Sequence, residues 1–308
     1  MKINYFRYLG FCLVMLFVSI TAYLLWSFFY PSVPKNTYQT LFEGITYIRD
    51  VRQTPRPIII HLVKIDLTQP NIRFLVTPSK PFENGEIIAR TTRQFLTEFQ
   101  LQLAINGNFF YPFHPLFSLD FLNAYPAKHG DPVYVVGFAS SRGQIYSKAT
   151  QHFETLYISA DNQAQFQTPI GAIYNAISGR ELFLQQGQIQ TPCREGAFNT
   201  IPYPRTAIAL DKSAQTLMLF VVDGKRKNYS EGVTLMELAT IVQAYHANIA
   251  LNLDGGGSST LVMEGPAGTP IFLNSPINGR IPGYERLIAN HLGIYALKSS
   301  TPFPTPPN

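Results

Sequence analysis

The chain has 308 residues, of which 46% are hydrophobic and 14% are charged. That length allows one large domain or two small ones, and the composition predicts a well-packed globular body with a more apolar segment beside it. The formal net charge is only +5 at pH 7. The basic cluster Lys225–Lys227 (KRK) is more typical of a solvated turn than of a nucleic-acid-binding face, so we expect no nucleic-acid partner.

The N-terminal segment predicts membrane insertion. Residues 8–30 contain no charged side chain, and about 20 apolar residues span a bilayer as a helix. Lys2 and Arg7 precede this run, so the positive-inside rule places residues 1–7 in the cytoplasm and the rest of the chain outside it. We expect a single-pass signal anchor in the cell membrane with an extracytoplasmic domain in the cell envelope. A cleaved signal peptide is the alternative, although its apolar core is usually shorter.

The exported part predicts one domain between two short flanking segments. Residues 31–40 are typical of a linker, residues 41–298 form the domain, and the proline-rich residues 299–308 are typical of a disordered tail. Cys193 is the one cysteine beyond the anchor, which excludes an intramolecular disulfide there.

Short apolar runs separated by turn residues dominate the domain, which is typical of β-strands. The predicted strands are Ile58–Asp66, Ile72–Thr77, Leu103–Asn106, Val133–Ala139, Leu156–Ser159, Ala207–Leu210, Leu217–Val222, Ile249–Leu253 and Leu292–Ala296. Two helices are predicted, at Thr91–Phe99 and at Thr234–Ala247, where Thr234 and Glu237 form a capping box. The pattern predicts an α+β fold: a mixed, largely antiparallel sheet domain with a few packed helices, preceded by one transmembrane helix.

The strongest chemical signal is the stretch Leu251–Leu261 (LNLDGGGSSTL), in which Asp254 ends an apolar run. Side chains at strand ends project into clefts of sheet-based folds. Gly255–Gly257 leave room for a ligand, and their N–H groups can face an anion. The spacing excludes a P-loop, a dinucleotide-binding turn and a G-x-S-x-G nucleophile elbow. A glycine-rich turn without a ligand is the structural alternative.

Other polar residues accompany predicted strands in the same way. They are Asn106 and Asn108 in INGNFF, Arg205 in PRTA, Asp223 in VVDG, and Asn274, Glu285 and Arg286 after the glycine-rich turn. Each alone is typical of an ordinary hairpin turn or a surface ion pair.

Taken in order, these motifs resemble those of the phosphodiester glycosidase family. The segments that carry the resemblance are INGNFF, AISG (176–179), PRTA, VVDG, SEGVTLMELA, LNLDGGGSST, Asn274 and Glu285–Arg286. The resemblance covers about residues 100–295 and is most specific over 230–260. It implies hydrolysis of the bond between the anomeric carbon of a sugar, such as N-acetylglucosamine, and a phosphodiester oxygen. Asn108 departs from the small residue usual at its position, which leaves the sugar open.

The resemblance also implies roles for single residues. A sugar that departs through an oxocarbenium-like state needs a nearby carboxylate, which points to Asp254 with Glu285 as its partner and Asp223 as a third candidate. Guanidinium groups bind phosphate oxygens. The predicted substrate-binding residues are Asn106, Asn108, Arg205, Asn252, Gly255, Gly256, Gly257, Ser258, Ser259, Asn274 and Arg286.

We expect no metal ion or cofactor, because the histidine spacing matches no transition-metal motif. A calcium ion at Asp254 has no specific motif behind it. The expected partners are a sugar phosphodiester or polysaccharide and, through the N-terminal helix, the membrane. Two alternatives are a glycan-binding module without turnover and a phosphodiesterase that cuts the P–O bond.

Overall fold

A computed structural model of the protein describes residues 5–29, 32–79, 87–111, 130–190 and 197–298. The predicted tail over 299–308 and most of the segment 111–130 lie outside these residues. The helices are α1 (Tyr5–Phe29), α2 (Thr92–Glu98), α3 (Ala197–Thr200) and α4 (Leu235–Ala244), with the 3₁₀ turns η1 (Gly256–Ser258) and η2 (Pro266–Gly268).

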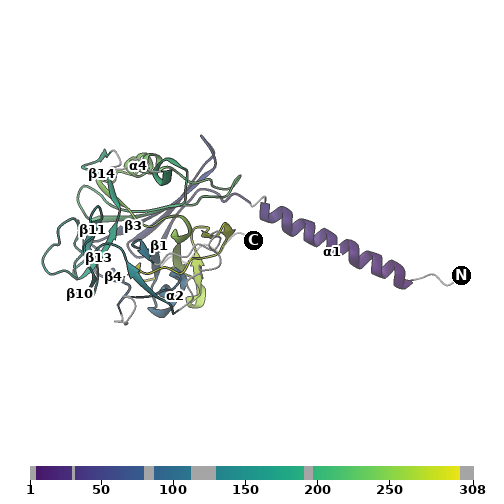
Figure 1. The fold of residues 1–308 in the computed structure, drawn as a ribbon, viewed down its shortest axis with the longest axis horizontal. Coiled ribbons are helices and arrows are strands. Elements are labelled where there is room, and N and C mark those ends of the chain that lie inside the picture. The colour runs from purple at the N-terminus through teal and green to yellow at the C-terminus, as the bar shows by residue number, and fades with distance from the viewer. Residues whose placement is uncertain (1–4, 30–31, 80–86, 112–129, 191–196, 299–308) are drawn as a thin grey trace.

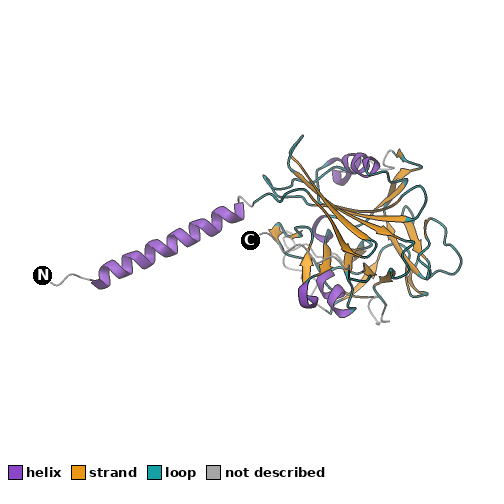
Figure 2. Cartoon of the chain, turned by 180° about the vertical axis from the view of Figure 1, so that it is seen from behind, coloured by secondary structure: helices purple, strands orange, loops and turns teal. Residues whose placement is uncertain are grey.

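Strands make up most of the domain (Figure 2). The eight-stranded sheet contains, in spatial order, β1 (Thr37–Phe42), β2 (Ile45–Arg52), β3 (Ile58–Asp66), β17 (Thr216–Val222), β16 (Arg205–Leu210), β18 (Ile249–Asn252), β14 (Glu181–Gln185) and β15 (Gln188–Ile189). One five-stranded sheet contains β10 (Gln144–Ser147), β9 (Ala139–Ser141), β13 (Asn175–Gly179), β11 (Glu154–Ile158) and β12 (Ala164–Phe166). A second contains β20 (Pro270–Phe272), β19 (Leu261–Glu264), β6 (Leu103–Asn106), β23 (His291–Tyr295) and β4 (Arg73–Val76).

Two smaller sheets complete the domain. They are β5 (Ile87–Ile88), β8 (Pro132–Val135) and β7 (Phe110–Tyr111), and the hairpin of β21 (Ile277–Asn278) and β22 (Ile281–Pro282). Neighbouring strands of the described sheets pair antiparallel, for example β16 with β17 and with β18. This arrangement confirms the predicted α+β class with largely antiparallel sheet.

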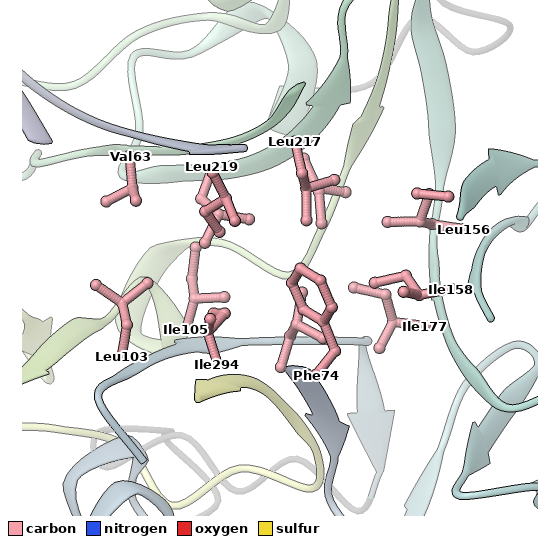
Figure 3. Packing of buried hydrophobic residues seen from close by; sticks show 14 of the residues in the cluster. Val63, Phe74, Leu103, Ile105, Leu156, Ile158, Ile177, Leu217, Leu219 and Ile294 are labelled. Carbon is pink, nitrogen blue, oxygen red and sulfur yellow. The ribbon is translucent and has the colours of Figure 1, made fainter. Parts of the chain in front are cut away.

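The main core lies between the sheets (Figure 3). Leu217 and Leu219 of β17 point from the eight-stranded sheet toward Ile105 of β6, and Ile158 of β11 packs beside them. Because side chains alternate along a strand, the intervening Met218 belongs to a second core on the opposite face of the same sheet.

Helices cover the outer faces of the two main sheets. Leu235 and Leu238 of α4 pack on the second core, and Phe95 of α2 packs on the outer face of the β6 sheet. Figure 1 shows α4 and α2 at opposite ends of the domain, with the sheets between them. The domain is therefore layered as helix, sheet, sheet and helix, and strands such as β17 are apolar on both faces because both faces are covered.

The start of α4 confirms the predicted capping box. The Thr234 Oγ1 accepts a hydrogen bond of 3.2 Å from the Glu237 N–H, and the Glu237 carboxylate accepts one of 2.8 Å from the Thr234 N–H. These bonds satisfy N–H groups that a helix start leaves without intrahelical partners.

Two predicted boundaries are wrong. The predicted strand Val133–Ala139 is divided into β8 and β9, because Gly137 has a φ of 87° and turns the chain between them. Part of the predicted linker over 31–40 is structured: β1 begins at Thr37 and pairs with β2, where Tyr38 lies opposite Ile48.

The N-terminal helix α1 extends away from the domain (Figure 1). Its described side chains, residues 8–23 and 26, are exposed. Among the described residues, no helix is both long enough and apolar enough to cross a membrane. The membrane span stays a prediction.

Candidate active site

Asp254 lies at a junction of three sheets. Asp254 comes shortly after the end of β18. Strand β16 pairs with β18, and Ala207 of β16 lies opposite Asn252 of β18. The Asp254 N–H donates a hydrogen bond of 3.3 Å to the Gly107 carbonyl group directly after β6. Next to β18, the Arg180 N–H between β13 and β14 donates one of 2.9 Å to the Asn252 carbonyl group. Chain ends from separate sheets thus meet around one carboxylate.

Asn106 holds the backbone at this junction. Its amide group donates a hydrogen bond of 2.6 Å to the Asp254 carbonyl oxygen, and its Oδ1 accepts bonds from the Thr206 hydroxyl at 3.0 Å and the Thr260 N–H at 3.2 Å. Asn106 is fully buried. These contacts support a role for Asn106 in holding the backbone of the turn that carries Asp254.

The glycine-rich segment after Asp254 forms the tight turn η1. The Gly255 N–H donates to the Asp254 Oδ1 at 2.9 Å, and the Gly256 N–H donates to the Pro204 carbonyl group at 2.8 Å. A Cβ atom at Gly257 would lie 2.5 Å from the Arg286 Nη2. The guanidinium group therefore packs directly against the backbone, and a side chain at this position would displace it.

Arg286 and Ser258 surround the Asp254 carboxylate. The Arg286 Nη1 donates a hydrogen bond of 3.1 Å to the Ser258 hydroxyl, and its Nε donates one of 3.3 Å to the Asn278 Oδ1. Burial raises the pKa of Asp254, whereas the Ser258 hydroxyl, the Arg286 charge and the Gly255 N–H oppose that rise. Burial lowers the pKa of Arg286, and the charge of Asp254 counteracts it. The carboxylate is therefore held in a poorly solvated place beside a guanidinium group.

Arg205 is a second buried guanidinium group near Asp254. Its Nε donates a hydrogen bond of 3.1 Å to the Val233 carbonyl group. Burial lowers the pKa of Arg205, while the nearby Tyr203 and the carboxylate of Glu181 counteract this effect. Because it is the first residue of β16, its side chain reaches the same end of the sheet as Asp254.

These residues line one cavity of about 350 Å³, a size within the usual range for small-molecule sites. The lining residues are Phe109, Phe110, Arg180, Asn199, Tyr203, Arg205, Asn252, Leu253, Asp254, Gly255 and Arg286. Five of the sequence-predicted site residues are therefore brought together here: Arg205, Asn252, Asp254, Gly255 and Arg286. Gly256, Gly257, Ser258 and Ser259 follow Gly255 in the chain and are buried.

Glu285 does not line the cavity, in contrast to the prediction that it works with Asp254. Its Oε2 accepts a hydrogen bond of 2.6 Å from the Arg93 Nε, and its Oε1 accepts one of 3.1 Å from the Arg93 N–H. Both oxygens are thus engaged at the start of α2. Glu285 thus anchors the segment from which its neighbour Arg286 reaches the cavity.

Asp223 and Asn274 also lie outside the cavity lining. Asp223 is buried, and its carboxylate accepts hydrogen bonds from the His61 Nε2 at 3.1 Å, the Asn274 Nδ2 at 3.1 Å and the Ser275 N–H at 2.9 Å. Asn274 in turn donates to the Ser259 carbonyl group at 3.1 Å. These contacts support a structural role beneath the glycine turn rather than contact with a substrate.

Asn108 is turned into the protein. Its Oδ1 accepts hydrogen bonds from the Ser178 N–H at 2.9 Å and the Asn290 Nδ2 at 3.0 Å, and its amide group donates to the Val136 carbonyl group at 3.1 Å. The amide thus ties β6 to β13, which explains physically why a residue larger than glycine stands there. Asn108 does not line the cavity.

The cavity lining also includes residues that the sequence analysis did not single out. Arg180 directly follows the AISG motif, Phe109 and Phe110 end INGNFF, and Tyr203 lies two residues before Arg205. These residues lie next to the recognised motifs in the sequence, and this proximity could have identified them. Asn199 of α3 carries no such signal.

Known proteins are similar to this chain over the region that contains the cavity residues. A family model described as phosphodiester glycosidase matches residues 99–295, which include the motifs discussed above. The human N-acetylglucosamine-1-phosphodiester alpha-N-acetylglucosaminidase is 31% identical over 112 residues, which cover 34% of this chain. The chain spans about a fifth of the length of this relative, since the match covers 21% of it.

Two solved structures share the fold. The catalytic domain of the zebrafish N-acetylglucosamine-1-phosphodiester alpha-N-acetylglucosaminidase, which is auto-inhibited by its pro-peptide, superposes with a TM-score of 0.57 at 19% identity, covering 87% of this chain and 85% of that one. A hypothetical protein from Synechocystis gives a TM-score of 0.56 at 16% identity, covering 86% of this chain and 64% of the other. At these identities the likeness concerns the fold.

Proposed function

The chain belongs to the phosphodiester glycosidase family, and on that premise we propose that it hydrolyses the bond between C1 of a sugar and the oxygen of a phosphodiester. The observation that carries this proposal is a cavity lined by Asp254 together with three arginines, Arg180, Arg205 and Arg286. A sugar phosphodiester presents the two features that such a set recognises: an electrophilic anomeric carbon and an anionic phosphate.

Asp254 is the residue we assign to the anomeric carbon. Departure of the phosphate leaves an oxocarbenium-like sugar, which an ionised carboxylate stabilises. The carboxylate also directs water to C1. The phosphate is already a good leaving group. The site therefore has to neutralise the negative charge of the phosphate more than it has to protonate the leaving oxygen.

The arginines bind the phosphate in this proposal. A guanidinium group matches phosphate oxygens with two parallel N–H donors. Arg205 and Arg286 are poorly solvated, so an incoming anion replaces hydration that their burial has removed. Phe109, Phe110 and Asn252 then offer aromatic faces and an amide group to the sugar.

The test is hydrolysis of the methyl phosphodiester of N-acetylglucosamine 1-phosphate in water enriched in ¹⁸O. Glycosidase action yields free sugar with ¹⁸O at C1 and unlabelled methyl phosphate. Asp254→Asn is expected to lower sugar release by at least about a hundredfold. Near-normal release by this variant would remove Asp254 from the mechanism.

The same experiment separates the two alternatives. A phosphodiesterase that cuts the P–O bond yields sugar 1-phosphate and methanol, with ¹⁸O in the phosphate. A glycan-binding module binds the diester and releases no product. Either outcome rejects the glycosidase proposal.

We further propose that α1 is a signal anchor that holds the domain outside the cytoplasm, where an envelope glycan or glycoconjugate is the substrate. The motivation is the exposure of apolar side chains along this helix, such as Phe17 at 71% and Leu9 at 58%. Membrane fractionation of the full chain and of a chain lacking residues 1–30, with protease digestion of intact cells, tests the proposal. An intact domain in the cytosolic fraction of cells that make the full chain would reject it.

A further inference from the structure

Lys225, the first residue of the basic cluster KRK, contacts the candidate site instead of solvent alone. Its Nζ donates a hydrogen bond of 2.6 Å to the Tyr203 hydroxyl and lies 3.9 Å from the centroid of the Tyr203 ring. Tyr203 lines the cavity that contains Asp254. The fold therefore joins a cluster that is typical of a solvated turn to the wall of the site.

Tyr203 is held on several sides. Its N–H and carbonyl group pair with those of Val233, each at 3.1 Å. Gly232, with a φ of 93°, approaches so closely that a Cβ atom there would lie 2.5 Å from the Tyr203 carbonyl carbon. At the ring edge, a Cβ atom at Gly256 would lie 2.5 Å from the Tyr203 Cε1. Two glycines thus make room for this tyrosine, and the ring keeps one orientation.

The backbone of Lys225 has a positive φ angle. Its φ of 59° lies in the left-handed region, which is unfavourable for a residue with a Cβ atom. The segment is kept there by a hydrogen bond of 3.3 Å from the Lys225 N–H to the Glu231 carbonyl group. In this turn the ammonium group contacts Tyr203.

The charges near Tyr203 suit an anionic ligand. Arg205 and Arg286 line the same cavity as Tyr203, and Lys225 contacts Tyr203 directly. Asp254 lines the same cavity, and its charge acts on Arg286. An ammonium group only donates, so Lys225 occupies a lone pair of the phenolic oxygen, and the O–H of Tyr203 donates in another direction.

We propose that Tyr203 is a substrate-contacting residue that donates its phenolic hydrogen to a phosphate oxygen, and that Lys225 is the positioning residue for that hydroxyl. The inference rests on the proposed function, since it names the group that recognises the phosphate of the same substrate. It adds a neutral, directional donor to the guanidinium groups of the cavity.

Three variants test the proposal: Tyr203→Phe, Lys225→Met and the two combined. Binding of methyl phosphate is measured by calorimetry, and kcat and KM are measured on the methyl phosphodiester of N-acetylglucosamine 1-phosphate. A hydrogen bond to a charged group corresponds to about a tenfold effect or more. Tyr203→Phe is therefore expected to weaken methyl phosphate binding and raise KM about tenfold, with a smaller change in kcat.

Lys225 is expected to act through Tyr203. Lys225→Met weakens binding less than Tyr203→Phe does, and Lys225→Arg restores most of it. The double variant is no weaker than Tyr203→Phe alone, because a residue that acts only through another adds nothing once its partner is removed. Lys227→Met is the matched control, since Lys227 belongs to the same cluster but is exposed, and it should bind methyl phosphate as the unaltered protein does.

Several results would overturn the proposal. They are wild-type affinity of Tyr203→Phe for methyl phosphate, additive losses in the double variant, an equal loss in Lys227→Met, and absence of methyl phosphate binding by the unaltered protein. Failure of the proposed function looks different: the unaltered protein then binds methyl phosphate but releases no sugar. In that case the binding measurements still decide the role of Tyr203.

Discussion

Asp254 and Asp223 are both acids at the ends of β-strands, yet their surroundings give them different chemistry. Asp254 lines a cavity beside Arg286, and its Oδ1 accepts a hydrogen bond from the Gly255 N–H. Asp223 has its oxygens occupied by His61, Asn274 and the backbone of Ser275. A carboxylate with its lone pairs engaged by protein donors holds structure together, whereas one beside a cavity can meet a substrate.

Substitution of Asp223 should therefore act on stability. Asp223→Ala leaves buried donors without an acceptor, and we expect it to lower the free energy of unfolding by about 3 kcal/mol. Urea denaturation checks this value, and kcat of the remaining folded protein should stay close to normal. Asp161→Ala, at an exposed turn, should change stability by less than about 0.5 kcal/mol. Loss of kcat without loss of stability in Asp223→Ala would restore Asp223 as a catalytic candidate.

The pH dependence of activity should report the environment of Asp254. Burial raises the pKa of this carboxyl group above its usual value of 3.8. If the ionised form is required, kcat/KM falls as the pH drops through the raised pKa, so the acidic limb lies above 3.8.

Ser258 provides a sharper form of this prediction. Its hydroxyl favours the ionised carboxylate, so Ser258→Ala should raise the pKa of Asp254 further and move the acidic limb to higher pH. Ser259→Ala is the control, because the Ser259 hydroxyl is hydrogen-bonded to the Thr206 hydroxyl instead. A limb that stays in place or moves to lower pH in Ser258→Ala would contradict the assignment.

At the scale of the element, the turn η1 depends on glycine for two separate reasons. Gly256 has a φ of 64°, which favours glycine, and its missing side chain leaves room for the Tyr203 ring. Gly257 lies against Arg286. The turn therefore lets two side chains of the site approach the backbone that carries Asp254.

A pair of glycine substitutions separates backbone strain from crowding of Tyr203. Gly256→Ala and Gly171→Ala both place a side chain at positive φ, 64° and 66°, but the space around Gly171 is open. Both variants should lose about 1 kcal/mol of stability from backbone strain. Gly256→Ala should additionally raise KM, because the ring of Tyr203 has to move. Equal KM values in the two variants would show that the ring position does not matter.

At the scale of the whole molecule, the domain is built without α1. The described members of its core clusters run from Leu41 to Ala296, and the described side chains of α1 are exposed. In Figure 1 the sheets lie between α4 and α2, and the N-terminal helix α1 extends away from them. Folding of the domain thus depends on contacts among its own sheets.

Deletion of residues 1–30 should accordingly leave the domain intact. We expect the free energy of unfolding to change by less than about 0.5 kcal/mol and kcat/KM on a soluble diester to stay the same. Denaturant titration and steady-state kinetics on detergent-solubilised full chain and on the shortened chain provide the comparison. A large loss of stability would mean that α1 packs on the domain.

The amino-acid sequence by itself determined the local features of this protein. Strand β3 has the predicted bounds Ile58–Asp66, and α4 begins at the predicted capping box of Thr234, because alternation of apolar residues and capping chemistry act between neighbours in the chain. The family was also identifiable from ordered short motifs, and the match over residues 99–295 confirms it.

Only the tertiary structure decided which of the predicted residues share one cavity. Glu285 faces Arg93 and Asp223 faces His61, partners far away in the chain. Conversely, Lys225 reaches Tyr203 because the segment after β17 packs against the segment before β16, where a Cβ atom at Gly224 would lie 2.7 Å from the Pro204 nitrogen. The direction in which a polar side chain points depends on such long-range contacts, and local sequence patterns carry no information about them.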